Sequence, residues 1–130
     1  MTEAPTSVRR LVGIYHADGG LWGELAYVAG KLRGTAHCAL CDITYGRLRA
    51  KTEWADYVAC LGVPFDVVHL NERPAEIAAF SEGRTPCVLA ETDDGLRMLL
   101  GPADLDAAGG DVDRFAVALS RAASSAGLAW

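Results

Sequence analysis

Cys38 and Cys41, two cysteines separated by two residues, are the side chains of this sequence best suited to chemistry. Their spacing lets the two sulfur atoms close a small disulfide ring or bind one metal ion. His37 directly precedes the pair, and a positively charged imidazole beside a thiol favours the reactive thiolate. The pair is therefore a candidate for redox chemistry, for metal binding, or for a purely structural role.

A metal site built on this pair needs further ligands, for which His37 and Cys60 are the candidates. Thiolate and imidazole ligands favour zinc or a thiophilic ion such as Cu(I). The sequence has no second Cys-x-x-Cys, which would complete a closed zinc ribbon. Cys60 also falls late on an apolar helical pattern, where a cysteine commonly packs as a small hydrophobic residue. The cofactor therefore stays open, with zinc and copper as the metals to test.

A second group of reactive side chains comes from the predicted strand ends. It consists of His16, Asp18, His69 and Cys87. The two histidines follow parallel strands and the cysteine begins an antiparallel one, so all four are expected at one edge of the sheet, where open α/β proteins bind ligands. Cysteine with histidine is the minimal activated-nucleophile pair, and both residues bind zinc. Burial of the thiol and backbone hydrogen bonding of the imidazoles are the competing interpretations.

The hydrophobic pattern predicts alternating strands and helices along the chain. The predicted elements are strands at 11–15, 40–45 and 63–70, helices at 21–32, 52–61 and 74–82, a hairpin of strands 85–90 and 96–100, and a last helix capped by Asp111. With a strand at 40–45, the pair Cys38 and Cys41 is expected at the edge opposite the histidines. If that strand begins later, the pair lies on a long loop that can fold toward either edge. The helix that follows would bring Cys60 close to the pair.

This order of elements resembles the thioredoxin-like fold over most of residues 11–123. Thr85-Pro86 stands where that superfamily has its cis-proline, and Asp93-Asp94-Gly95 stands at its hairpin. The resemblance implies an α/β three-layer sandwich, a mixed sheet of about five strands with flanking helices. The loop at 15–23, which in that superfamily normally carries the redox Cys-x-x-Cys, has no cysteine here, so the usual thioredoxin mechanism does not transfer. The segment 37–44 is also similar to uncharacterised bacterial proteins, from which no activity follows.

Composition argues against several classes of partner. The net charge is −5, with acidic residues along the whole length, whereas nucleic-acid binding relies on a concentrated basic face. No apolar run reaches the roughly 20 residues of a membrane helix. The opening MTEAPTSVRR also lacks the apolar centre of a signal peptide. We therefore expect one cytoplasmic thioredoxin-like domain at 9–130, behind a disordered tail at 1–8, without nucleic-acid or membrane partners.

Three functions are compatible with these residues. The first is a small thioredoxin-like protein whose Cys38 and Cys41 exchange disulfides with a protein or small-molecule partner. The second is a metal-binding protein that uses the same pair with His37 or Cys60. The third is a non-catalytic binding module on a degenerate thioredoxin fold. A homodimer is compatible with each of the three.

Overall fold

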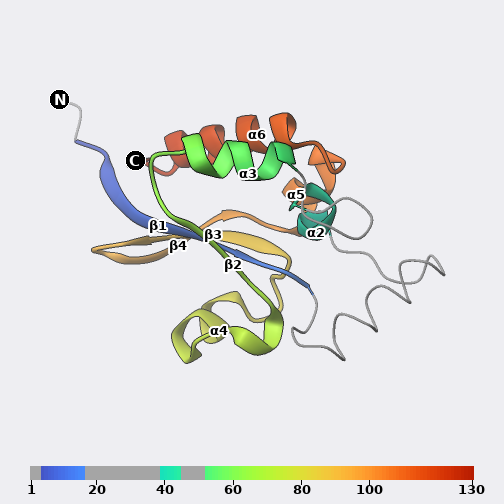
Figure 1. Cartoon of the computed structure of the whole chain (residues 1–130). Helices are drawn as coiled ribbons and strands as arrows, with labels where there is room; N and C mark the ends of the chain where they lie inside the picture. Colours follow the sequence, from blue (N-terminus) through green and yellow to red (C-terminus); the bar gives the residue numbers. More distant parts are fainter. Residues whose placement is uncertain (1–3, 17–38, 45–51) are drawn as a thin grey trace.

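A computed structural model describes residues 4–16, 39–44 and 52–130 of the chain (Figure 1). Within these residues, a central sheet has five strands. The strands are β1 (Thr6–Ile14), β2 (Phe65–Val68), β3 (Cys87–Thr92), β4 (Gly95–Leu100) and β5 (Leu128–Ala129). The α-helices are α2 (Ala39–Thr44), α3 (Thr52–Cys60), α4 (Ala75–Ser81), α5 (Pro102–Ala108) and α6 (Val112–Ser125), and a 3-10 helix covers Leu70–Glu72. None of the helices in the described ranges is long and apolar enough to cross a membrane.

The strand β1 lies inside the sheet, whose order is β2-β1-β3-β4. It pairs in parallel with β2, placing Ile14 opposite Val68, and antiparallel with β3, placing Ile14 opposite Cys87. The ends of β1 and β2 and the start of β3 therefore lie together. We call this end of the sheet, formed by residues 14–16, 68–69 and 85–87, the carboxyl edge.

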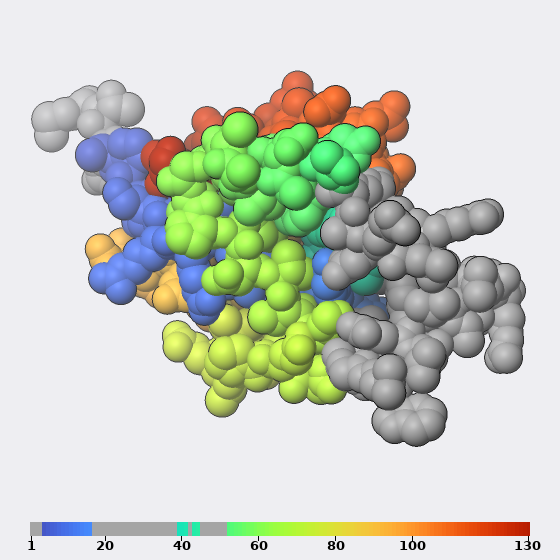
Figure 2. All heavy atoms as spheres, viewed as in Figure 1, coloured from blue at the N-terminus to red at the C-terminus, as the bar shows by residue number. Residues whose placement is uncertain are grey.

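Helices cover both faces of this mixed sheet. In Figure 1, α3 and α6 lie over one face and α4 lies under the other, and Figure 2 shows the side chains of these helices as layers above and below the strands. Successive residues of a strand point to opposite faces. Leu11 and Tyr15 accordingly belong to a larger core under α3 and α6, and Val12 and Ile14 to a smaller core against α4. The predicted α/β class, a mixed sheet with flanking helices, is confirmed.

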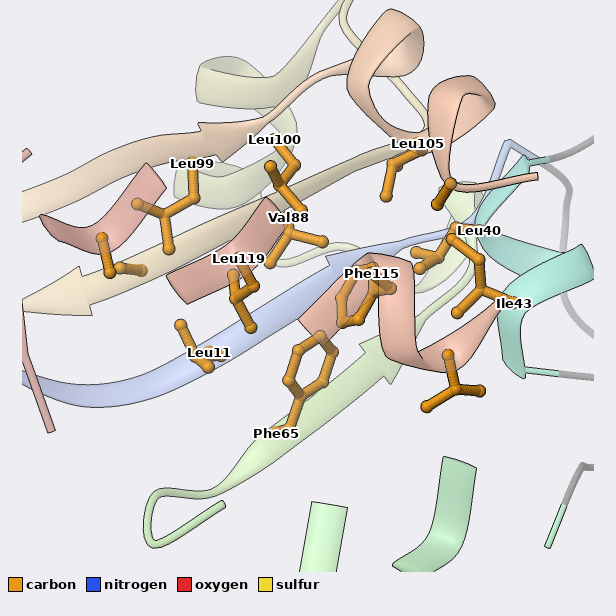
Figure 3. Packing of buried hydrophobic residues seen from close by; sticks show 14 of the residues in the cluster. Leu11, Leu40, Ile43, Phe65, Val88, Leu99, Leu100, Leu105, Phe115 and Leu119 are labelled. Atoms are coloured by element: carbon orange, nitrogen blue, oxygen red, sulfur yellow. The ribbon is translucent and has the colours of Figure 1, made fainter. Parts of the chain in front are cut away.

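The larger core is centred on aromatic rings from three elements. Trp54 of α3 lies 5.0 Å from the ring of Phe65 in β2 and 5.4 Å from that of Phe115 in α6, both in edge-on geometry. Figure 3 shows Phe115 and Phe65 beside Leu11 of β1. Edge-to-face ring pairs each add about 0.5–1.5 kcal/mol beyond the burial of their area. These contacts fix α3 and α6 to the sheet.

The smaller core leaves part of its face of the sheet to charged side chains. Arg10 of β1 donates hydrogen bonds to Glu91 of β3 at 2.8 Å and to Asp66 of β2 at 3.0 Å. These two carboxylates raise the pKa of Arg10. One guanidinium thus ties three strands together where α4 no longer covers them.

Several local predictions are confirmed. The peptide bond between Thr85 and Pro86 is cis. The strands β3 and β4 form an antiparallel hairpin that turns before Gly95, whose φ of 107° suits a glycine. Asp111 caps α6 by accepting a hydrogen bond from the Arg114 backbone N–H at 2.9 Å.

The strand predicted at 40–45 is wrong, because residues 39–44 form the helix α2. Leu40 and Ile43 are both fully buried in the larger core, and a spacing of three residues puts two side chains on the same face of a helix but on opposite faces of a strand. Burial has overridden the strand preference of Ile43 and Thr44. The helix predicted at 21–32 lies outside the described residues.

The tail predicted at 1–8 is also too long. The strand β1 begins at Thr6, because Thr6 and Ser7 pair in parallel with Leu128 and Ala129 of β5. A pairing between residues so far apart in the sequence leaves no local pattern from which it could be predicted. The strand predicted at 63–70 is correspondingly shorter, at Phe65–Val68.

Leu40 of α2 occupies the space beside β1 that a side chain at Gly13 would fill. A Cβ atom at Gly13 would lie 3.1 Å from Leu40 Cδ2 of α2 and 3.1 Å from Phe65 Cε1 of β2. Real Cβ contacts are rarely so short, so a larger residue would displace one of these two buried neighbours. Gly13 therefore sets the depth at which α2 packs.

We predict that Gly13→Val lowers the free energy of unfolding by about 1–3 kcal/mol, the usual cost of overpacking a core. Urea unfolding followed by far-UV circular dichroism measures this change. Ser7→Val is the matched control, because Ser7 lies on the same strand but is exposed, and it should change the free energy by less than about 0.5 kcal/mol. A Gly13→Val variant as stable as the parent would contradict this packing.

Candidate functional site

The carboxyl edge is joined to α2 by a buried hydrogen bond. The hydroxyl of Tyr15, which follows β1, lies 2.7 Å from Oγ1 of Thr44, the last residue of α2. Tyr15 is 5% exposed and Thr44 is 1% exposed. Thr44 Oγ1 in turn donates a long hydrogen bond, 3.5 Å, to the backbone carbonyl of Cys41. Because a hydroxyl has one proton, Tyr15 is the donor in its bond to Thr44.

Cys41 consequently lies near the carboxyl edge, not at the opposite end of the sheet as its predicted strand implied. Its side chain is 6% exposed and belongs to the larger core. The prediction failed because a strand at 40–45 would have carried the thiol to the start of the sheet, whereas α2 lies on the end of β1. Cys38 and His37 lie outside the described residues.

Cys60 is at the other end of the sheet and is exposed. It ends α3, and the chain then enters β2 beside Leu11, whose backbone N–H donates to the Pro64 carbonyl at 2.8 Å. From Leu11 to Tyr15 the strand rises by roughly 13 Å, at about 3.3 Å per residue. The structure therefore does not bring Cys60 to Cys41. Among the described residues, no three His, Cys, Asp or Glu side chains are grouped so that they could hold a metal ion.

His69 follows β2 at the carboxyl edge and is held there by Glu72. The Oε1 atom of Glu72 accepts from the backbone N–H of His69 at 2.8 Å and lies 2.6 Å from its ring Nδ1. The backbone hydrogen bond, then the ring contact, lower the pKa of the Glu72 carboxyl. The imidazole also lies 5.0 Å from the ring of Tyr15, centroid to centroid. Glu72 and Tyr15 thus fix the orientation of His69.

His16 lies at the same edge and contacts the segment that leads into β3. Its Nδ1 is 2.9 Å from Oγ1 of Thr85, the residue of the cis peptide bond with Pro86. The imidazole is exposed. Asp18, the fourth member of the predicted group, lies outside the described residues.

Cys87 begins β3 opposite Ile14 and is fully buried in the smaller core. Burial raises the pKa of its thiol to about 11, against a smaller opposing effect of the positive charges of Arg84 and Arg73. A thiol with this pKa is protonated at neutral pH and is a poor nucleophile. Cys87 shares the carboxyl edge with the histidines, and its burial favours the structural interpretation.

The structure thus brings His16, His69 and Cys87 to the carboxyl edge and adds residues that the sequence analysis missed. The missed residues are Tyr15, Thr44, Glu72 and Thr85. Glu72 had a detectable signal, because a carboxylate three residues after His69 is the spacing of a capping box. Tyr15 and Thr44 had none, since their contact depends on α2 being a helix.

We predict that the free energy of unfolding falls as the pH rises from 9 to 11, in part because of Cys87. In this range the unfolded chain loses the Cys87 proton while the folded chain keeps it, so deprotonation favours unfolding. Cys87→Ala should therefore lose stability less steeply with pH than the parent. Urea unfolding at several pH values, with a reductant present, measures the slopes.

Cys60→Ala is the control for this experiment, because its thiol is exposed in the folded protein, and it should retain the parental slope. Tyr57 adds to the slope of every variant, since burial raises its pKa to about 12. Equal slopes for Cys87→Ala and the parent would show that the Cys87 thiol titrates alike in the folded and unfolded chains.

Comparison with known proteins leaves this chain without a match. No protein-family model, no curated protein and no solved structure matches it.

Proposed function

We propose that this protein is a thioredoxin-like thiol–disulfide exchange protein of the cytoplasm, with Cys38 as the attacking and Cys41 as the resolving cysteine. The observation that carries the proposal is the burial of Cys41 on α2, close to the carboxyl edge. A buried thiol is shielded from the disulfides of other molecules, so it suits an intramolecular second step. The first step, attack on a partner, then belongs to Cys38.

The exchange balances with two thiols and one partner disulfide. The Cys38 thiolate attacks one sulfur of the partner disulfide, which forms a mixed disulfide and releases one partner thiolate. The Cys41 thiol loses its proton and attacks the Cys38 sulfur, releasing the second partner thiolate. The protein is left with a Cys38–Cys41 disulfide, and the partner has gained two electrons and takes up two protons.

His37 has a supporting role in this proposal. An imidazolium next to Cys38 in sequence favours the thiolate of the attacking residue. The partner is a disulfide on a protein or on a small molecule. The mixed sheet with helices on both faces, closed by an antiparallel hairpin and a long helix, agrees with the fold that the thioredoxin-like resemblance implies. The cytoplasm, which keeps such thiols reduced, is the compartment in which we expect the exchange.

The test uses the whole chain in a Cys60→Ser background, because the exposed Cys60 thiol would otherwise react with the same reagents. Reduced protein is mixed with oxidised glutathione, and the products are identified by peptide mass spectrometry. We expect a Cys38–Cys41 disulfide and two equivalents of reduced glutathione. Cys41→Ser should stop at a stable mixed disulfide on Cys38, and Cys38→Ser should reduce glutathione release to background.

Cys87→Ala is the control variant, because Cys87 is buried on the other face of the sheet, and it should leave the products unchanged. A pair that forms no disulfide with any excess of oxidised glutathione would overturn the proposal. Stoichiometric metal bound by Cys38 and Cys41 in untagged protein would overturn it as well, in favour of a metal-binding protein. Unchanged binding of a partner after both cysteines are replaced would favour a non-catalytic module.

A further inference from the structure

We infer that Tyr15 is a positioning residue for Cys41: its hydroxyl, acting through Thr44, holds α2 and its thiol in place at the carboxyl edge. This inference rests on the proposed function, in which Cys41 resolves the mixed disulfide. It concerns the described residues Tyr15, Cys41 and Thr44. It adds a tyrosine to a reaction otherwise assigned to cysteines and a neighbouring histidine.

The helix α2 depends on contacts outside itself. It has six residues, whereas isolated helices shorter than about 12–15 residues are marginal in water. Leu40 and Ile43 bury one side of it, and Figure 3 shows both pointing into the core near Leu105 and Phe115. Apolar packing of this kind is not directional. A hydrogen bond adds direction to this packing and favours one orientation of the turn that carries Cys41.

Tyr15 supplies a directional contact of this kind, and Tyr15 is itself held in place by the sheet. Its backbone N–H donates to the Val68 carbonyl at 2.9 Å, which continues the pairing of β1 with β2. Its ring packs against His69 at 5.0 Å. The hydroxyl then donates to Thr44 at 2.7 Å, and Thr44 donates to the Cys41 carbonyl. This chain of contacts links the position of Cys41 to the central strand β1.

The resolving step is sensitive to this position. A disulfide forms only when the attacking sulfur reaches the sulfur it attacks with the correct geometry, so loss of orientation slows the step. The first step involves a different thiol and a partner from solution. Removal of the Tyr15 hydroxyl should therefore slow resolution and leave attack unchanged, a separation that a general loss of stability would not produce.

Tyr15→Phe tests the inference in the Cys60→Ser background, with the two steps measured separately as the formation and the decay of the mixed disulfide with glutathione. We expect an unchanged rate of formation and a decay slowed roughly 2- to 12-fold, the change that corresponds to one net hydrogen bond of about 0.5–1.5 kcal/mol. Thr44→Val should reproduce the effect, and Thr44→Ser, which keeps the hydroxyl, should restore the parental rate. Equal slowing of both steps, or no slowing, would overturn the inference.

A second measurement does not depend on the exchange reaction. Alkylation of the reduced protein by iodoacetamide is followed at each cysteine by peptide mass spectrometry, with buried Cys87 as the internal reference for global unfolding. Tyr15→Phe should raise the Cys41 rate relative to the Cys87 rate roughly 2- to 12-fold, because α2 opens locally. Tyr57→Phe, which alters a half-buried tyrosine of the same core, is the matched control and should leave the ratio unchanged.

The two measurements separate failure of the inference from failure of the proposed function. A parental protein that performs no exchange, with a Cys41 to Cys87 ratio that still rises in Tyr15→Phe, would overturn the exchange function and retain Tyr15 as the residue that positions Cys41. A parental protein that exchanges normally, with a ratio and a decay rate unaffected by Tyr15→Phe, would overturn the inference alone.

Discussion

Gly13 lies where Leu40 of α2 and Phe65 of β2 both press against the central strand β1. A side chain at this position would displace Leu40 or Phe65, so the glycine favours the depth of packing at which Thr44 meets the hydroxyl of Tyr15. The burial of Cys41 follows from the same contact, since α2 carries it into the larger core. The glycine thus lets α2, and with it Cys41, pack close to β1.

The register of the sheet then decides what lies beside that thiol. Ile14 is paired with Val68 on one side and with Cys87 on the other, so the residues that come next, Tyr15 and His69, are neighbours. Glu72 holds His69 through two contacts to one carboxylate oxygen. A short stretch of pairing therefore gathers a phenol, an imidazole and a carboxylate at the carboxyl edge, and the phenol contacts the end of α2. Cys87 also lies at the carboxyl edge, but it is buried in the smaller core on the other face of the sheet.

Much of the fold was predictable because strong local signals coincided with it. Asp111 capped a helix, the Asp-Gly turn made a hairpin, and apolar runs marked the strands. The site was less predictable, because α2 is too short to have a clear helical period and includes the β-branched residues Ile43 and Thr44. Its helical form comes from burial, chiefly against α5 and α6, and no pattern within six residues records that. The position of Cys41 depended on this one element. The predicted topology therefore placed His16, His69 and Cys87 at the correct edge of the sheet and Cys41 at the wrong one.

The pairing of β5 with the start of β1 places both ends of the described chain at one end of the sheet. Thr6 donates its backbone N–H to the Gly127 carbonyl at 2.8 Å, so the first and last strands lie side by side. They do so at the end of the sheet from which β1 runs toward the carboxyl edge. A fluorophore, a surface tether or a fused protein joined at Thr6 or at Ala129 would therefore be attached at the end of the sheet opposite the carboxyl edge. Either attachment would leave Tyr15, His16 and His69 at the opposite end of β1.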